Sequence, residues 1–187
     1  MEPVAAPPRL ARPALAQSQL AAQSPPLPAA NFFQLLANSP AATKAYLSWN
    51  GALAAGGQLT GRQREILALA VAEINGAKYD LEAHARASRS LGMSEQDICL
   101  ARKATAPAPN DKALLQFARA VVLQRGDISD LDFEAMRRAG FTDAQITEVI
   151  SAIALNIFTN YFNHVGRTPL EPPPARVPAG KGRSSSL

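Results

Sequence analysis

The sequence has few of the residues that build disulfide frameworks and metal centres. It contains one cysteine, Cys99, and two histidines, His84 and His164, among 187 residues. A single cysteine excludes an internal disulfide, and we expect Cys99 to behave as a small buried hydrophobic residue. His84 and a nearby carboxylate offer two metal ligands, and the sequence nominates no third, so we predict no metal site.

Long hydrophobic runs are also missing. No stretch reaches the roughly 18 apolar residues that a membrane-spanning helix needs. Proline and glutamine interrupt every apolar segment before Asn31, where a secretory signal would need one. We therefore expect a cytoplasmic protein without a membrane partner. Arg9 and Arg12, with few acidic residues around them, leave an organelle-import segment open as an alternative.

Proline and the excess positive charge both gather near the ends of the chain. Residues 1–30 are rich in Ala, Pro and Gln, and residues 166–187 end in a basic, serine-rich stretch. Neither segment has an apolar period that could offset the entropy of ordering its backbone. We predict one domain, residues 31–165, between two disordered tails.

The distribution of charge argues against a nucleic-acid partner. Residues 31–165 hold 13 basic and 13 acidic side chains, whereas the two tails hold 6 basic and 2 acidic ones, which accounts for the net charge of +4. A core without net charge and without a basic stripe does not suit a nucleic-acid groove.

Apolar spacing in the core is helical throughout and predicts a single all-α domain. Ile146, Val149, Ile150 and Ile153 follow the i, i+3, i+4, i+7 pattern. The segment 66–72 is apolar nearly all round, which predicts a helix enclosed by others. The expected helices span residues 32–38, 41–55, 61–74, 78–91, 95–103, 112–124, 130–139 and 143–164.

Caps and stops support these boundaries. Thr60 with Gln63 forms a capping-box pattern, and Asn75-Gly76 is a natural stop between two helices. Residues 92–98 and 140–146 echo each other, since each reads as a glycine stop, an apolar residue, a hydroxyl cap and a reciprocal cap. Convergence of helix corners and an old duplication both explain the echo, and in either case its role is structural.

One group of polar residues could carry chemistry. Asp80 lies four residues before His84 on the same predicted helix face, where a carboxylate can fix the imidazole tautomer. Tyr79 adds a phenolic donor. Glu65 lies among apolar residues on the preceding helix, where a carboxylate needs a partner, and a tight turn could bring it close to His84. By spacing alone, structural roles for these residues are the commoner outcome.

The same residues resemble a known family. Residues 59–65 and 77–84 are similar to the signature of the alkylhydroperoxidase D / carboxymuconolactone decarboxylase family, a Glu followed twelve residues on by Cys-x-Tyr-Cys-x-x-x-His. Glu65, Tyr79 and His84 fall on its Glu, Tyr and His. Ala77 and Asp80 stand where the thiol peroxidases of the family carry their cysteines, and neither can form a sulfenic acid. The resemblance implies an alkylhydroperoxidase D-like helical bundle in a homo-oligomer, commonly trimer-based.

The departure from the cysteine pair favours proton transfer over thiol chemistry. Tyr79 to His84 resembles the cysteine-free decarboxylase form of the signature, which needs no cofactor. In that form His84 would donate the proton, Glu65 would act as a second acid/base, Tyr79 would orient the substrate and Asp80 would hold His84. The expected substrate is a small organic acid, lactone or carbonyl compound, with Arg62, Arg64 and Arg86 as candidate cations. A non-catalytic oligomeric binding protein and a peroxide-reducing protein are the alternatives.

Overall fold

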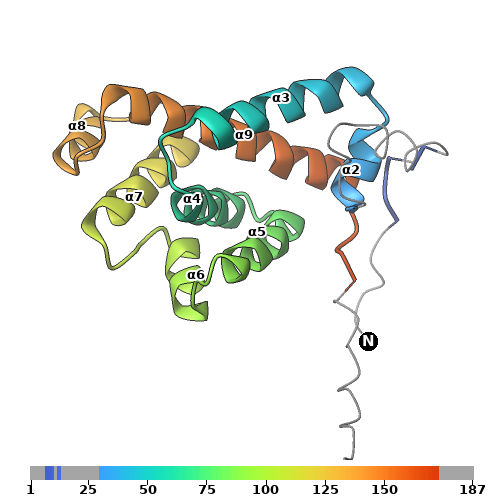
Figure 1. Cartoon of the computed structure of the whole chain (residues 1–187), viewed down its shortest axis with the longest axis horizontal. Coiled ribbons are helices and arrows are strands. Elements are labelled where there is room, and N and C mark those ends of the chain that lie inside the picture. Colours follow the sequence, from blue (N-terminus) through green and yellow to red (C-terminus); the bar gives the residue numbers. More distant parts are fainter. Residues whose placement is uncertain (1–6, 11, 14–29, 173–187) are drawn as a thin grey trace, which may run out of the picture.

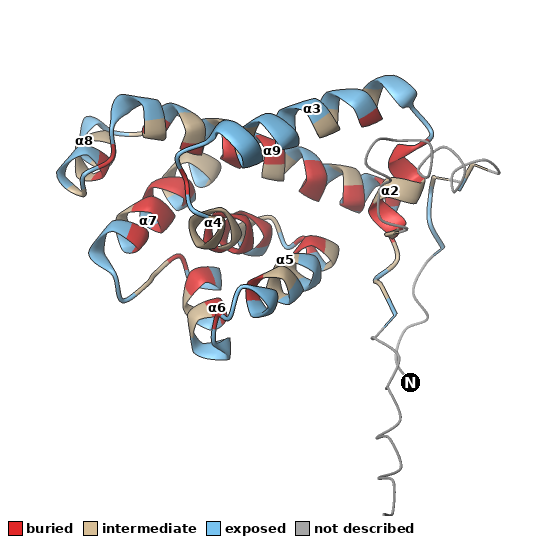
Figure 2. Ribbon diagram, in the orientation of Figure 1, coloured by how far each residue is buried: buried red, intermediate tan, exposed pale blue. Residues whose placement is uncertain are grey.

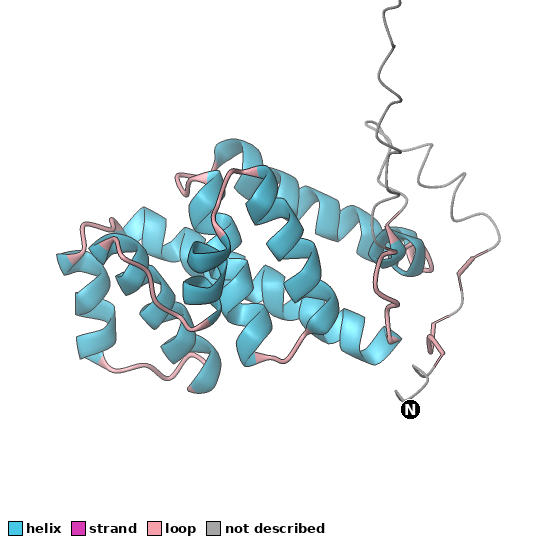
Figure 3. Cartoon of the chain, turned by 90° about the horizontal axis from the view of Figure 1, so that it is seen from below, coloured by secondary structure: helices cyan, strands magenta, loops and turns pink. Residues whose placement is uncertain are grey.

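The structure is a computed structural model that describes residues 7–10, 12–13 and 30–172. Within these ranges the chain forms helices and no strand, so the predicted all-α class is confirmed (Figure 3). The helices are α2 (Asn31–Leu36), α3 (Pro40–Gly56), α4 (Gly61–Ile74), α5 (Lys78–Ser90), α6 (Glu95–Arg102), α7 (Pro109–Leu123), α8 (Asp130–Arg138) and α9 (Asp143–Gly166). Most of the predicted tails, residues 1–6, 14–29 and 173–187, lie outside the described residues.

Helix α4 lies at the centre of the bundle, and α5, α6, α7 and α9 pack around it (Figure 1). Every residue from Ile66 to Ala72 is buried, whichever way its side chain points (Figure 2). A fully buried leucine or isoleucine contributes roughly 1.5–3 kcal/mol relative to an exposed one. The apolar run at 66–72 therefore both predicts the central position and stabilises it, and the prediction is confirmed.

Helix α9 is the longest helix and runs beside α3 across one side of the bundle (Figure 1). Trp49 Nε1 donates a hydrogen bond to Ser151 Oγ at 2.8 Å, which ties the two helices together. The Glu148 carboxylate accepts from the backbone N–H groups of Gln58 and Leu59 at 2.6 and 3.1 Å. Helix α9 thus fixes the connection through which the chain enters α4.

The two echoing segments form the same corner. Gly92 and Gly140 have φ of 78° and 92°, the left-handed conformation that ends a helix. The next residues, Met93 and Phe141, each donate their N–H to a carbonyl five residues earlier at 3.1 Å, and both side chains are buried. Capping boxes then start α6 and α9. The predicted structural role of the echo is confirmed.

Every helix boundary except the start of α7 lies within two residues of the predicted one. Helix α7 begins at Pro109, three residues before the expected start, because proline needs no hydrogen-bonded N–H in the first turn. Helix α9 continues to Gly166, and Arg167 follows in the left-handed conformation with φ of 52°.

Contacts continue beyond the predicted domain end at residue 165. Glu171 Oε1 accepts the backbone N–H of Asn31 at 2.6 Å, and Asn31 Nδ2 donates to the carbonyl of Pro169 at 3.0 Å. Residues of the predicted C-terminal tail therefore hold the first turn of α2. In the described ranges, no helix has the length and hydropathy needed to cross a membrane.

Candidate functional site

Glu65 and His84 form a pair between α4 and α5. His84 Nδ1 lies 2.9 Å from Glu65 Oε2, and the two side chains are 27% and 21% exposed. The helices reverse direction at Asn75-Gly76, where Gly76 takes a φ of 64° that favours glycine. The proximity of Glu65 and His84, inferred from an antiparallel pair joined by a tight turn, is confirmed.

The geometry of this pair suits proton transfer. A carboxylate at Nδ1 fixes the orientation of the imidazole ring and leaves Nε2 as the atom that can exchange a proton with a bound molecule. Because both side chains are partly exposed, solvent reaches part of the pair.

Asp80 does not hold His84. No hydrogen bond joins the two side chains, although both belong to the described part of the chain. Asp80 is 4% exposed, and its carboxylate accepts a hydrogen bond from Asn163 Nδ2 at 3.0 Å. Helical spacing places Asp80 and His84 near each other on α5, but the packing of α9 against α5 turns Asp80 toward Asn163.

Tyr79 is engaged with the ends of the domain. Its hydroxyl donates to Glu171 Oε1 at 2.8 Å and accepts from the backbone N–H of Phe32 at 3.1 Å. Burial raises the pKa of Tyr79, and the neighbouring Glu171 carboxylate raises it further. The phenol is therefore a neutral structural bridge between α2, α5 and the segment after α9.

A pocket of about 730 Å³ lies where the start of α5 meets the end of α9, and we call it the α5–α9 pocket. Ala77 and Asp80, at the two positions where the thiol peroxidases carry cysteines, both line it, together with Asn163 and Thr168. Neither Glu65 nor His84 lines it. The sequence did not point to Asn163 or Thr168. Asn163 is next to His164 and belongs to no motif of its own, and Thr168 lies beyond the expected domain end.

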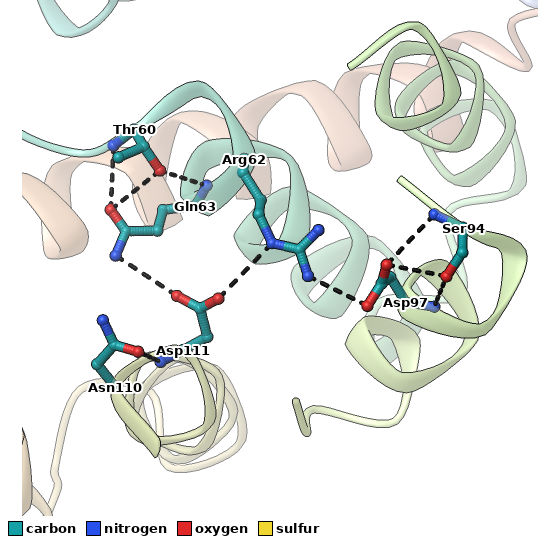
Figure 4. A network of polar contacts seen from close by, with 7 residues as sticks. All are labelled: Thr60, Arg62, Gln63, Ser94, Asp97, Asn110 and Asp111. Atoms are coloured by element: carbon teal, nitrogen blue, oxygen red, sulfur yellow. Dashed lines mark hydrogen bonds and ion pairs between the residues drawn. The ribbon is translucent and has the colours of Figure 1, made fainter. Parts of the chain in front are cut away.

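Two of the three candidate arginines already have partners within the protein. Arg62 Nη2 lies 3.2 Å from Asp97 Oδ1 and its Nε lies 3.8 Å from Asp111 Oδ2, so it joins the starts of α6 and α7 (Figure 4). Arg64 Nη1 donates to the carbonyl of Leu59 at 2.6 Å. Arg86 is exposed on α5. Arg62 and Arg64 therefore serve the fold rather than a substrate carboxylate.

The remaining rare residues have different surroundings. Cys99 is exposed on α6, so the expectation of a buried cysteine was wrong; its helix turns only Ile98 and Ala101 into the core. His164 Nε2 lies 3.0 Å from the carbonyl of Asn75, which packs α9 on the α4–α5 corner. Among the described residues, no three His, Cys, Asp or Glu side chains gather as a metal site would require.

Three solved structures are similar to this architecture. The fold is shared with an uncharacterized peroxidase-related protein from Silicibacter sp. TM1040, at a TM-score of 0.68 and 23% identity over 74% of each chain. An uncharacterized peroxidase-related protein from Ralstonia eutropha JMP134, described as an alkylhydroperoxidase AhpD core, matches at 0.69 and 27% identity over 75% of this chain and 76% of that one. A putative antioxidant defence protein AhpD from Agrobacterium tumefaciens matches at 0.67 and 27% identity over 73% and 95%.

The class of protein is thus an all-helical bundle of the alkylhydroperoxidase D type. Residues 40–122, which run from α3 into α7 and include Glu65, Tyr79, Asp80 and His84, match the model of the Carboxymuconolactone decarboxylase family. This match, together with the shared fold, supports the resemblance of the chain to that family. No curated protein matches the sequence.

Proposed function

We propose that the protein is a cofactor-independent acid/base enzyme in which His84 transfers a proton and Glu65 orients the imidazole. The observation that carries the proposal is the 2.9 Å contact between His84 Nδ1 and Glu65 Oε2 in a position that solvent reaches. The substrate is a small organic acid, lactone or carbonyl compound. Decarboxylation is the nearest named reaction, because the family model carries that name.

The proposed step balances without a cofactor. The bond between the substrate carbon and its carboxylate breaks, CO2 leaves, and the electron pair passes into the conjugated carbonyl system. The protonated imidazole of His84 then gives its Nε2 proton to the resulting carbanion, and neutral His84 regains a proton from water. Glu65 faces the charged ring during this cycle and keeps Nε2 aimed at the substrate.

Tyr79 and Asp80 have supporting roles in this proposal. The Tyr79 hydroxyl is engaged with Phe32 and Glu171, and Asp80 with Asn163. Both residues fix the start of α5, and therefore the direction in which that helix presents His84 one turn further on. They are positioning residues rather than proton carriers.

The experiment is a test of CO2 release from carboxymuconolactone and from a set of 2-oxo and 3-oxo acids. We expect His84→Gln to lower the rate by about 10²–10⁴-fold, the usual contribution of a positioned acid or base. Glu65→Gln should have a smaller effect than Glu65→Leu, because the amide oxygen still accepts from Nδ1. Glu82→Gln, an exposed change on the same helix, is the matched control.

Two alternatives are separated by a peroxide assay and by a Cys99→Ser variant. Peroxide reduction is suggested by the names of the structural neighbours, and here Cys99 is the one thiol that could serve it. Peroxide turnover that Cys99→Ser abolishes would establish that alternative. A folded protein that releases CO2 from none of the acids and consumes no peroxide would favour a non-catalytic binding protein.

We also propose that the protein forms a homo-oligomer. In the family that the sequence resembles, such oligomers are commonly trimer-based. Ile150, Tyr161 and Val165 on α9 are 46%, 56% and 62% exposed, and Trp49 on α3 is 38% exposed. Exposed apolar side chains that recur along one helix favour association. Light scattering after size-exclusion chromatography measures the mass; a monomer at all concentrations would overturn this proposal.

A further inference from the structure

We propose that the α5–α9 pocket binds a small organic acid that carries a hydrogen-bond donor, an ammonium or a hydroxyl, at its other end. This inference does not rest on the proposed function, because Glu65 and His84 do not line the pocket. It rests on three features: buried acceptors without enough donors, exposed cations at the same pocket, and an apolar wall between them.

The acceptors are Asp80 and Asn163, which are 4% and 6% exposed. One hydrogen bond, from Asn163 Nδ2 to Asp80 Oδ2, joins them. Asn163 Oδ1 is buried and finds no partner among the described residues. A buried carboxylate and a buried amide oxygen with one shared hydrogen bond between them are costly. A ligand ammonium placed between them has enough N–H groups to donate to both, and a ligand hydroxyl can donate to one of them.

The Asp80 carboxylate affects the pKa of a partly buried neighbour, Tyr46. Burial raises the pKa of Tyr46 to about 12, and the Asp80 carboxylate adds to the rise. No cationic side chain of the described residues forms an ion pair with Asp80. An ammonium or hydroxyl donor is therefore the ligand group that suits this end of the pocket.

Cations lie at the same pocket. Lys78 and Arg167 both line it, both are exposed, and neither forms an ion pair within the described part of the chain. Ala77, the residue that caps α5, offers no side-chain acceptor to the first-turn N–H groups, so the positive end of the helix also faces this region. These groups favour the carboxylate of the ligand.

Thr168 gives a second unpartnered group. The residue lines the pocket and is 9% exposed, and its Oγ1 is buried without a partner in the described ranges. A hydroxyl can donate as well as accept. Thr168 follows Arg167 directly, so it can contribute a hydrogen bond close to the proposed carboxylate position.

The wall between the two ends is apolar. The residues of this wall are Pro7, Pro8, Pro169 and Leu170. The N–H of Arg9 donates to the carbonyl of Gly166 at 2.9 Å, and this bond ties the segment with the first two prolines to the end of α9. The volume lies within the roughly 300–1,000 Å³ range of small-molecule sites. A short aliphatic chain with different polar groups at its two ends fits this arrangement.

The test is calorimetric titration of the full chain with four six-carbon probes. 6-Aminohexanoate and 6-hydroxyhexanoate carry both groups, hexanoate lacks the donor, and 1,6-hexanediol lacks the carboxylate. We expect one or both of the first two to bind, and the other two to bind at least about tenfold more weakly, since a charge-assisted hydrogen bond contributes more than a factor of ten. The stronger of the first two identifies the donor as ammonium or hydroxyl.

Variants locate the binding. Lys78→Gln with Arg167→Gln should weaken binding of the carboxylate-bearing probes about tenfold or more. Lys44→Gln with Lys112→Gln removes the same charge from exposed positions outside the pocket and should leave binding unchanged. Asp80→Asn should abolish the preference for a probe with a donor, with circular dichroism verifying the fold.

Several results would overturn the inference. One is the absence of binding by both bifunctional probes; another is hexanoate binding as tightly as they do. Equal loss in the Lys44/Lys112 control would show that only net charge matters. Unchanged binding in the Lys78/Arg167 variant would place any bound acid elsewhere.

Discussion

Asp80 and Asn163, 83 residues apart in the sequence, meet in the interior through a 3.0 Å hydrogen bond from Asn163 Nδ2 to Asp80 Oδ2. The bond joins the first turn of α5 to the last turns of α9. It is the contact that carries Asp80 away from His84 and into the α5–α9 pocket.

Loss of this bond should destabilise the fold. Asn163→Ala leaves a buried carboxylate without its donor, so we expect the free energy of unfolding to fall by about 1–3 kcal/mol. Asn156→Ala is the control, because Asn156 donates only to the carbonyl of Ala152 in its own helix. Urea unfolding measures both. Equal losses in the two variants would mean that the Asp80 contact has no special weight.

Asp97 should titrate below the usual range of aspartate. Hydrogen bonds from Ser94 lower the pKa of Asp97 most, and Arg62 lowers it further. The charged form is the one stabilised by folding, so its contribution is present above the ordinary aspartate range and is lost as the pH falls through the lowered pKa. NMR titration should show a larger rise of this pKa in Ser94→Ala than in Arg62→Gln; the reverse order would contradict the assignment of causes.

Tyr46 should ionise late. Its pKa of about 12, raised by burial and by Asp80, lies above that of an unfolded tyrosine near 10. The folded state keeps the phenol protonated where the unfolded state loses its proton, so stability falls as the pH rises between these two values. Absorbance titration of Tyr46→Phe should lose one late-titrating phenol. A lost phenol that titrates near 10 would contradict the burial argument.

Restoring the cysteine pair tests why Ala77 and Asp80 matter. Ala77 caps α5 and Asp80 lies in its first turn, where a thiolate is stabilised by the helix N-terminus. In a Cys99→Ser background, Ala77→Cys with Asp80→Cys should add peroxide consumption in the presence of a dithiol, while Cys99→Ser alone shows none. A folded but inert double variant would show that the cysteines are not the only difference from the thiol peroxidases.

Much of the fold could be predicted because its signals are local. The capping box at Thr60, the stop at Gly76 and the two glycine corners each act within one turn of helix, and the structure has them where the sequence indicates. The proximity of Glu65 and His84 could be predicted too, since a tight turn between two helices leaves few ways for them to pack against each other. The roles of these residues in catalysis, and the cytoplasmic location, remain predictions.

Residue type and spacing along one helix are enough to predict the helical class, the order of the helices and the absence of a Cys-x-x-Cys pair. The partner of each polar side chain depends instead on how the helices pack against one another. Asp80 faces Asn163 rather than His84, Cys99 is exposed, and Glu171 returns to hold Asn31 and Tyr79. These contacts join residues far apart in the chain, and their geometry follows from how whole helices pack, which no local pattern encodes.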